Sequence, residues 1–323
     1  MRTLLWALLL AAAPGCGGTP VTTPNDAGDA SPADTAPTDS AAPADTNTPA
    51  DTTAPADTGP MVMRGHDSFV PMGQRPMDAA RVIVLGDSIS AGVGASRTAL
   101  RYPNQLATND PSTMAGMGVD LATRYGHPVT VMNLAMGGAT TTTMRQNQLA
   151  TLRGRLPLMG HSVVVVTIGG NDLQLAIATG QDPTARILTE AVANIRATVA
   201  FLQDRANFPD GVSVYLSNVY DPSDGEGFIE NCFFNLRLPQ FVRALDVWRD
   251  RFVALGRELS FSVVDALGHF HGHGHHATEM ENQWYDPRDP TRWFADCIHP
   301  NDRGHHELRR LFFEAVDGTY RVP

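Results

Sequence analysis

Three side chains of this 323-residue chain could act together as a nucleophile, a base and an acid. Ser88 lies in Gly-Asp-Ser, directly after a short apolar run, and His299 follows Asp296 by three residues near the C-terminus. An aspartate at that spacing on a loop can accept the imidazole Nδ1–H, which leaves Nε2 free to take a proton from a serine. Each motif is weak alone, because Ser88 could cap a helix and His299 could be an exposed loop residue.

Two further clusters could stabilise negative charge that develops on a reacting oxygen. Gly137-Gly138 follows a second apolar run, and a backbone N–H there could approach a substrate closely. Asn171, in Gly-Gly-Asn-Asp after a third run, offers an amide donor without a charge. The structural alternatives are a small-residue turn for the glycines and a helix cap for the Asn-Asp pair.

Short apolar runs must position these clusters. Runs without alternation predict strands that are buried on both faces of a parallel sheet, and apolar residues at three- and four-residue spacing predict helices between them. Strands that alternate with helices imply a three-layer α/β sandwich, whose sites form at the carboxyl ends of the strands. We predict strands over 81–86, 128–134, 162–168, 212–219 and 261–264, and helices over 183–205, 238–259 and 301–316.

Taken in order, the four clusters resemble the motifs of the SGNH (GDSL) hydrolase family. The family has a Ser in Gly-Asp-Ser, a Gly, an Asn in Gly-x-Asn-Asp, and a C-terminal Asp-x-x-His-Pro, which match Ser88, Gly138, Asn171 and the Asp296/His299 pair. Gly138 fits the family spacing better than Gly137, and Ile89 replaces the usual leucine after the serine. The resemblance covers about residues 81–316 and implies an α/β/α sandwich with a flavodoxin-like, five-stranded parallel sheet.

The resemblance also implies a mechanism. Ser88 would attack an ester carbonyl, His299 would act as the base, and Asp296 would orient the imidazole. The N–H groups of Ser88 and Gly138 and the Asn171 amide would form the oxyanion hole, with no metal and no cofactor. We expect a serine esterase for short acyl groups on a carbohydrate or a lipid. Acyl transfer to a glycan, and a binding or metal-scavenging lipoprotein on a hydrolase scaffold, are the alternatives.

The first 16 residues have the form of an export signal. An apolar run from Leu4 to Ala13 is too short to span a bilayer, and Ala13–Cys16 resembles the lipobox of bacterial lipoproteins. We predict lipidation at Cys16, a disordered Ala/Pro/Thr/Asp-rich tether over 17–62 and a catalytic domain over 63–323. An ordinary cleaved signal is the alternative. The prediction places the protein in the bacterial cell envelope, held on a membrane, with the outer membrane as the expected site.

The charge of the chain limits the kinds of partner that it can bind, and its lysine and cysteine content limits the chemistry that it can carry out. The net charge is −10, but residues 1–60 hold one Arg and seven Asp, so the remainder carries about −4 and has no basic groove for nucleic acid. The chain contains no lysine, which excludes a Ser–Lys dyad or a Schiff base. We expect a monomer. With Cys16 lipidated, Cys232 and Cys297 remain as an even pair in an oxidising compartment, which favours a disulfide over two free buried thiols.

Three other features have competing explanations. Alternating histidines over 269–276 could chelate Zn²⁺ or Cu²⁺, but interleaved glycines favour a flexible rim over the active site whose histidines bind substrate or are solvated. Asp221, Asp224 and Glu226 favour a turn over a Ca²⁺ site. Aromatic residues late in the chain could line an acyl or sugar pocket or could pack a long loop onto the domain; these are Trp284, Tyr285, Trp293 and Phe294.

Overall fold

The computed structural model describes residues 75–109 and 119–319. The predicted signal peptide, Cys16 and the tether therefore lie outside the described residues, as does the predicted start of the domain at 63. No helix in the described part is both long and apolar enough to cross a membrane.

The elements, in chain order, are β1 (Arg81–Gly86), α2 (Ser88–Ala91), η1 (Thr98–Leu100), α3 (Tyr102–Ala107), α4 (Leu121–Tyr125), β2 (Thr130–Asn133), α5 (Thr141–Thr143), η3 (Met144–Gln148), α6 (Leu149–Arg153), β3 (Ser162–Thr167), α7 (Gly170–Ala178), α8 (Pro183–Arg186), η4 (Ile187–Ala191), α9 (Val192–Gln203), β4 (Val212–Ser217), η5 (Phe233–Asn235), α10 (Pro239–Leu259), β5 (Ser262–Val264), α11 (Ala266–Phe270) and α12 (Asp302–Asp317).

Five parallel strands form one sheet in the order β2-β1-β3-β4-β5. This is the flavodoxin-like order, in which the chain reverses direction across the sheet beside β1. All five predicted strands are confirmed, with ends that differ by up to two residues. The carboxyl ends of β1, β2 and β3 lie side by side, so the residues that follow these three strands meet at one edge.

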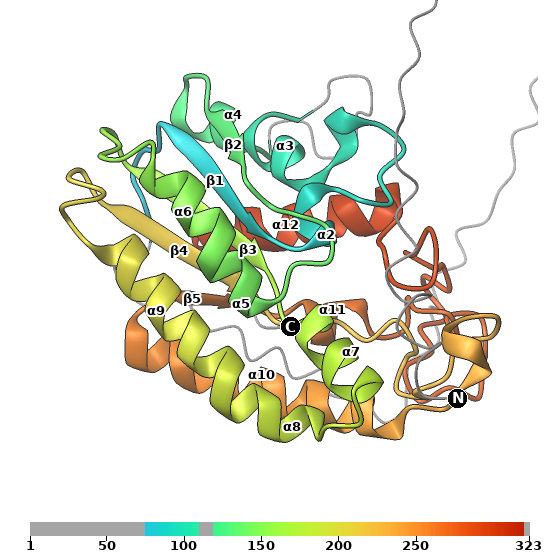
Figure 1. Cartoon of the computed structure of the whole chain (residues 1–323). Coiled ribbons are helices and arrows are strands. Elements are labelled where there is room, and N and C mark those ends of the chain that lie inside the picture. Colours follow the sequence, from blue (N-terminus) through green and yellow to red (C-terminus); the bar gives the residue numbers. More distant parts are fainter. Residues whose placement is uncertain (1–74, 110–118, 320–323) are drawn as a thin grey trace, which may run out of the picture. The chain divides into compact units, whose positions relative to one another are not determined.

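The sheet is buried on both faces because alternate residues of each strand enter different apolar clusters. Ile83 and Leu85 of β1 pack into a cluster with η3, α6, α9 and α10, whereas Val82 and Val84 pack into a second cluster with α3 and α12. Figure 1 shows the corresponding layers, with α6, α9 and α10 in front of the sheet and α12 behind it. The predicted three-layer α/β/α sandwich is confirmed.

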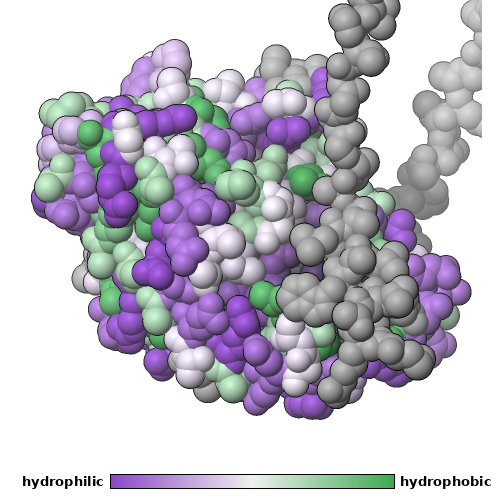
Figure 2. Space-filling model, viewed as in Figure 1, coloured by the Kyte–Doolittle hydropathy of each residue, from purple (hydrophilic) through white to green (hydrophobic). Residues whose placement is uncertain are grey.

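The long predicted helices are present, and one of them is interrupted. The predicted helix over 183–205 consists of α8 and α9 joined by the π-helical segment η4. The predicted helices over 238–259 and 301–316 correspond to α10 and α12. On the face in Figure 2, hydrophilic residues are interspersed with hydrophobic ones over the front helices, as expected where an outer layer meets solvent.

Residues 218–238 and 271–300, here called the C-terminal lobe, hold η5 and otherwise consist of turns, bends and irregular loops, with an isolated antiparallel bridge between Phe294 and Pro300. The buried Asp224 carboxylate organises the lobe, because it accepts the N–H groups of Gly272, Gly274 and His276 at 2.9–3.1 Å. Asp221 accepts the N–H groups of Ser223 and Gly225, which confirms the predicted turn. In the described residues, no group of three His, Cys, Asp or Glu side chains is arranged to hold a metal ion.

The histidine-rich segment is packed, and the expectation that its histidines are solvated is wrong for two of them. His271 and His273 are buried, with 8% and 4% exposure. His271 stacks on Trp284 with ring centroids 4.0 Å apart, and His273 stacks on Trp293 at 3.5 Å. Trp293 and Phe294 belong to the second apolar cluster, so these two aromatics pack the long loop onto the domain. The interleaved glycines let the backbone curl around Asp224, which composition alone does not reveal.

A disulfide joins Cys232 to Cys297 and confirms the predicted pairing. It connects the two segments of the C-terminal lobe across 65 residues of chain. A covalent link over a loop of that length removes much of the conformational freedom of the unfolded chain.

Replacing both cysteines by serine should therefore destabilise the domain. We expect the free energy of unfolding to fall by about 2–4 kcal/mol, measured by urea denaturation of the double variant and the unreduced wild type. Dithiothreitol should lower the stability of the wild type by a similar amount and leave the double variant unchanged. Equal urea midpoints for the two proteins would contradict the expectation.

Candidate active site

The turn from β1 to α2 exposes a serine at the start of a short helix. Gly86 has φ +119°, and a Cβ at this residue would lie 2.0 Å from the carbonyl oxygen of Thr167, so only glycine fits between β1 and β3. Asp87 is the N-cap, and its Oδ1 accepts the N–H of Ile89 at 3.1 Å. Ser88 is the first residue of α2, where a backbone N–H has no intrahelical acceptor. The capping residue is thus Asp87, and the Ser88 hydroxyl is not used as a cap.

Neighbouring segments hold this turn by hydrogen bonds to its backbone. The buried Gln148 amide accepts from the N–H of Gly86 at 2.8 Å and donates to its carbonyl at 2.7 Å. Asn133, the last residue of β2, donates from Nδ2 to the Ser90 carbonyl at 3.0 Å, and in the segment that follows β2 the N–H of Met136 donates to the Gly86 carbonyl at 3.1 Å. These contacts fix the segment after β2 against the serine.

Ser88, His299 and Asp296 form a continuous chain of hydrogen bonds. His299 Nε2 lies 2.9 Å from Ser88 Oγ, and His299 Nδ1 lies 2.8 Å from Asp296 Oδ2. Asp296 Oδ1 also accepts the N–H groups of Ile298 and His299 at 2.9 and 2.8 Å. Partial burial alone would raise the pKa of Asp296, but the bonds from the His299 ring and from the two backbone N–H groups outweigh it and lower that pKa to about 2. The carboxylate is therefore ionised at neutral pH.

A buried polar network lies beneath the nucleophile. Thr167 Oγ1 donates to Asp87 Oδ1 at 2.8 Å and lies 2.8 Å from Ser90 Oγ, which in turn lies 2.7 Å from the Tyr102 hydroxyl. All four side chains are buried. Burial raises the pKa of Asp87 to about 6, although its hydrogen bonds from Thr167 and from the Ile89 N–H oppose the rise.

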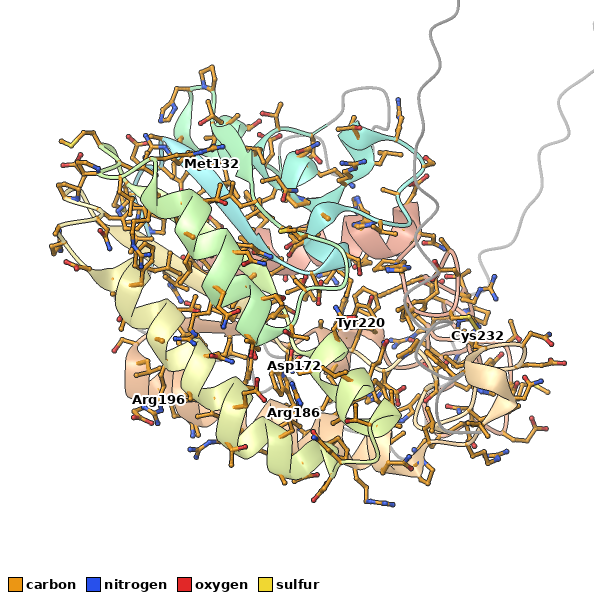
Figure 3. All side chains as sticks on the ribbon, in the orientation of Figure 1. Met132, Asp172, Arg186, Arg196, Tyr220 and Cys232 are labelled. Carbon is orange, nitrogen blue, oxygen red and sulfur yellow. A yellow bond between two sulfur atoms is a disulfide. The ribbon has the colours of Figure 1, made fainter. Side chains whose placement is uncertain are left out.

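The two predicted oxyanion segments are joined to each other. Gly138 has φ +74° with open space around a Cβ, so the backbone conformation and not crowding calls for glycine there. Asn171, in the first turn of α7, donates from Nδ2 to the Ala139 carbonyl at 3.0 Å. Asp172 accepts from both the N–H and the hydroxyl of Thr141 at 2.9 and 2.7 Å; Figure 3 labels Asp172 where α7 meets α5.

The start of α12 is attached to the loop that follows Ser88. Asp302 accepts the N–H and the hydroxyl of Ser96 at 2.7 and 2.6 Å. The buried His305 donates from Nε2 to the Val93 carbonyl at 3.0 Å, and burial lowers its pKa to about 4, so the ring is neutral at pH 7. A Cβ on Gly94 would lie 2.1 Å from the Pro300 carbonyl oxygen. The segment after His299 thus lies directly against the segment after Ser88.

The structure brings the predicted acid, base and nucleophile into contact and ties Gly138, Asn171 and Ser88 to one edge of the sheet. Sequence reasoning missed the supporting residues. Asp87 is part of the Gly-Asp-Ser motif, and its position directly before α2 could have identified it as the N-cap of that helix. Gln148 has no sequence signal, because its partner is 62 residues away. Tyr220 and His275, whose side chains contact the carbonyls of Ile298 and Asp296, also gave no signal for that role.

Comparison with known proteins identifies related sequences and folds. The family model described as "GDSL-like Lipase/Acylhydrolase family" matches residues 84–307, which is more than half of the chain. Among curated proteins, the comparison found no match to this chain.

Several solved structures have a similar fold at low sequence identity. BT4096, a gut microbial diltiazem-metabolizing enzyme, is 17% identical with a TM-score of 0.50; the match covers 75% of this chain and 47% of that one, so this chain spans about half its length. LAE5, an α/β hydrolase enzyme from the metagenome of Lake Arreo, is 17% identical with a TM-score of 0.49, over 77% of this chain and all of that one. Axe2, an acetylxylan esterase from Geobacillus stearothermophilus, is 17% identical with a TM-score of 0.48, over 77% and 98%.

The buried Asp87 carboxyl predicts a pH-dependent term in stability. Its folded pKa of about 6 exceeds the unfolded value of 3.8, so the folded state holds the proton more tightly, and the stability that this gives below pH 4 is lost as pH rises through 6. An Asp87→Asn variant lacks this term. Relative to the variant, the wild type should lose about 2–3 kcal/mol of unfolding free energy between pH 4 and pH 8, measured by urea denaturation. A difference that stays constant over this range would contradict the prediction.

Proposed function

Because the chain belongs to the GDSL-like lipase/acylhydrolase family and is a carboxylic ester hydrolase, we propose that Ser88 is its nucleophile, His299 its general base and Asp296 the carboxylate that orients the base. The observation that carries the proposal is the 2.9 Å contact between Ser88 Oγ and His299 Nε2. At this distance one proton can pass from the hydroxyl to the ring. Asp296, 2.8 Å from Nδ1, stabilises the positive charge that the ring then acquires.

The proposed acylation step forms a bond from Ser88 Oγ to the ester carbonyl carbon while His299 Nε2 takes the hydroxyl proton. The carbonyl oxygen becomes an oxyanion in a tetrahedral intermediate. When the intermediate collapses, the bond to the alcohol oxygen breaks and His299 returns the proton to that oxygen. The products are the free alcohol and an acyl ester on Ser88.

The oxyanion would be held by three neutral donors, which are the N–H groups of Ser88 and Gly138 and the Asn171 amide. One position and one contact support this assignment. Ser88 occupies the first helical position, and one N–H of the Asn171 amide is fixed on the Ala139 carbonyl, which leaves its second N–H as a donor. Neutral, prearranged dipoles stabilise a developing negative charge without protonating it. Loss of one such donor costs on the order of a hundredfold in rate.

Deacylation would repeat these steps with water. His299 takes a proton from the water molecule as its oxygen attacks the acyl carbon, and then returns the proton to Ser88 Oγ as the ester bond breaks. The exposed side of Asp296, at 54% of its side-chain surface, places the acid–base pair close to bulk solvent. This access favours hydrolysis as the second step.

We propose that the substrate carries a short acyl group on a carbohydrate or a lipid. Two exposed apolar residues lie beside the nucleophile and could contact a small acyl chain. Val93, 41% exposed, donates its N–H to the Ser88 carbonyl, and Met136, 52% exposed, donates to the Gly86 carbonyl. Two such side chains offer contact for a short chain, but less than a long acyl chain needs for full burial.

The first test is loss of the nucleophile. Ser88→Ala should lower kcat for p-nitrophenyl acetate by at least about a thousandfold with little change in stability, since only one oxygen is removed. Thr151→Ala, at an exposed position of α6, is the matched control and should keep full activity. EDTA should leave wild-type activity unchanged. Retained activity in the Ser88 variant, or loss of wild-type activity with EDTA, would contradict the proposed mechanism. A series of longer p-nitrophenyl esters would define the preferred acyl-chain length.

We also propose that the protein is exported as a monomer and anchored in the bacterial envelope through lipid on Cys16. The lipobox-like Ala13–Cys16 segment supports this proposal, and acyl chains at Cys16 would hold the domain on a membrane. In a bacterial host, the wild type should incorporate labelled palmitate and sediment with membranes. Cys16→Ser should do neither while the esterase activity per molecule stays the same. Labelling of the serine variant would exclude Cys16 as the lipidation site.

A further inference from the structure

Residues 296–299, here called the acid–base segment, run from the proposed orienting carboxylate to the proposed base. The first three of them each contact a residue elsewhere in the chain. His275 Nε2 lies 3.0 Å from the Asp296 carbonyl oxygen, Cys297 is disulfide-bonded to Cys232, and the Tyr220 hydroxyl donates to the Ile298 carbonyl at 2.6 Å. Figure 3 shows Tyr220 between the sheet and the part of the C-terminal lobe that holds Cys232. The next residue in the chain is His299.

External contacts matter here because the local ones do not place the segment. The bonds from the Ile298 and His299 N–H groups fix the Asp296 carboxylate relative to its own turn, and the Ala295 N–H closes that turn on the His299 carbonyl. None of these bonds sets the distance from the turn to Ser88. Asp296 is also half exposed, so packing around its side chain contributes little.

His275 is itself rigidly placed. Its N–H donates to the Pro222 carbonyl at 2.9 Å, and the N–H groups of both neighbours, Gly274 and His276, donate to the buried Asp224 carboxylate. A Cβ on Gly274 would lie 2.6 Å from both Asp224 Oδ2 and the Pro222 carbonyl oxygen. The backbone that carries His275 therefore packs directly against a buried carboxylate.

The His275 ring is suited to donate a hydrogen bond. A carbonyl oxygen only accepts, so Nε2 must carry the proton that faces Asp296. Burial lowers the pKa of His275, and the nearby Arg292 and His276 act in the same direction against its hydrogen bonds to backbone. The ring is thus neutral at pH 7, with a defined tautomer.

We propose that His275 is a positioning residue, which sets the alignment of Asp296 and His299 with Ser88 by holding the Asp296 carbonyl. This inference rests on the proposed function. It gives one member of the histidine-rich segment a role in the reaction without contact with substrate. Tyr220 contributes to the same alignment, because its hydroxyl holds the carbonyl of Ile298, the residue that follows Cys297. Misplacement of a reacting group by about 1 Å can cost on the order of a hundredfold in rate, so a lost carbonyl contact can be seen in kcat.

The test compares two substitutions at this residue. His275→Leu removes the donor, and we expect kcat for p-nitrophenyl acetate to fall between about tenfold and a hundredfold while KM stays within about twofold. His275→Gln keeps an N–H donor at a similar reach and should restore most of kcat. His276→Leu is the matched control, since its Nε2 bonds to the Phe228 carbonyl, away from the acid–base segment, and should leave kcat unchanged. If His275→Leu does not fold, Tyr220→Phe, which removes a single hydroxyl, is expected to lower kcat in the same way.

A double-mutant cycle separates positioning from a general loss of structure. In a His299→Ala background, His275→Leu should have little further effect on the residual kcat, because the base that it aligns with Ser88 is gone. An equal fold-loss in both backgrounds, a change confined to KM, or no rescue by glutamine would overturn the positioning role. Retained activity in Ser88→Ala would overturn the proposed function instead, so the two failures are distinguishable.

Discussion

The hydrogen bond between Ser88 and His299 joins two side chains that are 211 residues apart in the chain. Neither residue can find the other through local structure, so their distance depends on the sheet and on what is packed against its carboxyl edge. The close approach of Gly86 to Thr167 sets the position of the serine, and the contact of Gly94 with Pro300 holds the end of the histidine segment that follows His299. Both are approaches of backbone to backbone, which change less than contacts between long side chains.

The sheet and the main catalytic candidates could be predicted because their signals are local. Unbroken runs such as Val163 to Val166 indicate burial on both faces, and the predicted strand followed by Gly-Asp-Ser places Ser88 at a strand end. The order of the strands, β2-β1-β3-β4-β5, was expected from the family resemblance and not from the apolar runs themselves. The amide of Gln148 bonds to Gly86 across 62 residues of chain, so sequence patterns alone did not identify it.

The C-terminal lobe was less predictable for a related reason. Its order comes from carboxylates that bind backbone N–H groups, and such bonds leave no periodic trace in the sequence. A run of histidines and glycines is typical of an exposed or metal-binding segment by composition. Here the rings stack on Trp284 and Trp293, which lie more than ten residues further along the chain. Propensity did not show that two tryptophans would cover the histidines, and the expectation of solvated rings failed for that reason.

The tethers on Asp296, Cys297 and Ile298 divide the protein into two functional modules. The sheet supplies the serine and the amide, whereas the lobe supplies the alignment of the proton-transfer pair. The lobe is fixed from within, by buried carboxylates and a covalent bond, and its exposed turns at 230–231, 278–281 and 290–292 form no part of the hydrogen-bonded chain through Ser88. Surface loops vary more readily than the scaffold beneath them. Selection for a different substrate could therefore remodel these turns while leaving proton transfer untouched, so that specificity and chemistry evolve as separate traits.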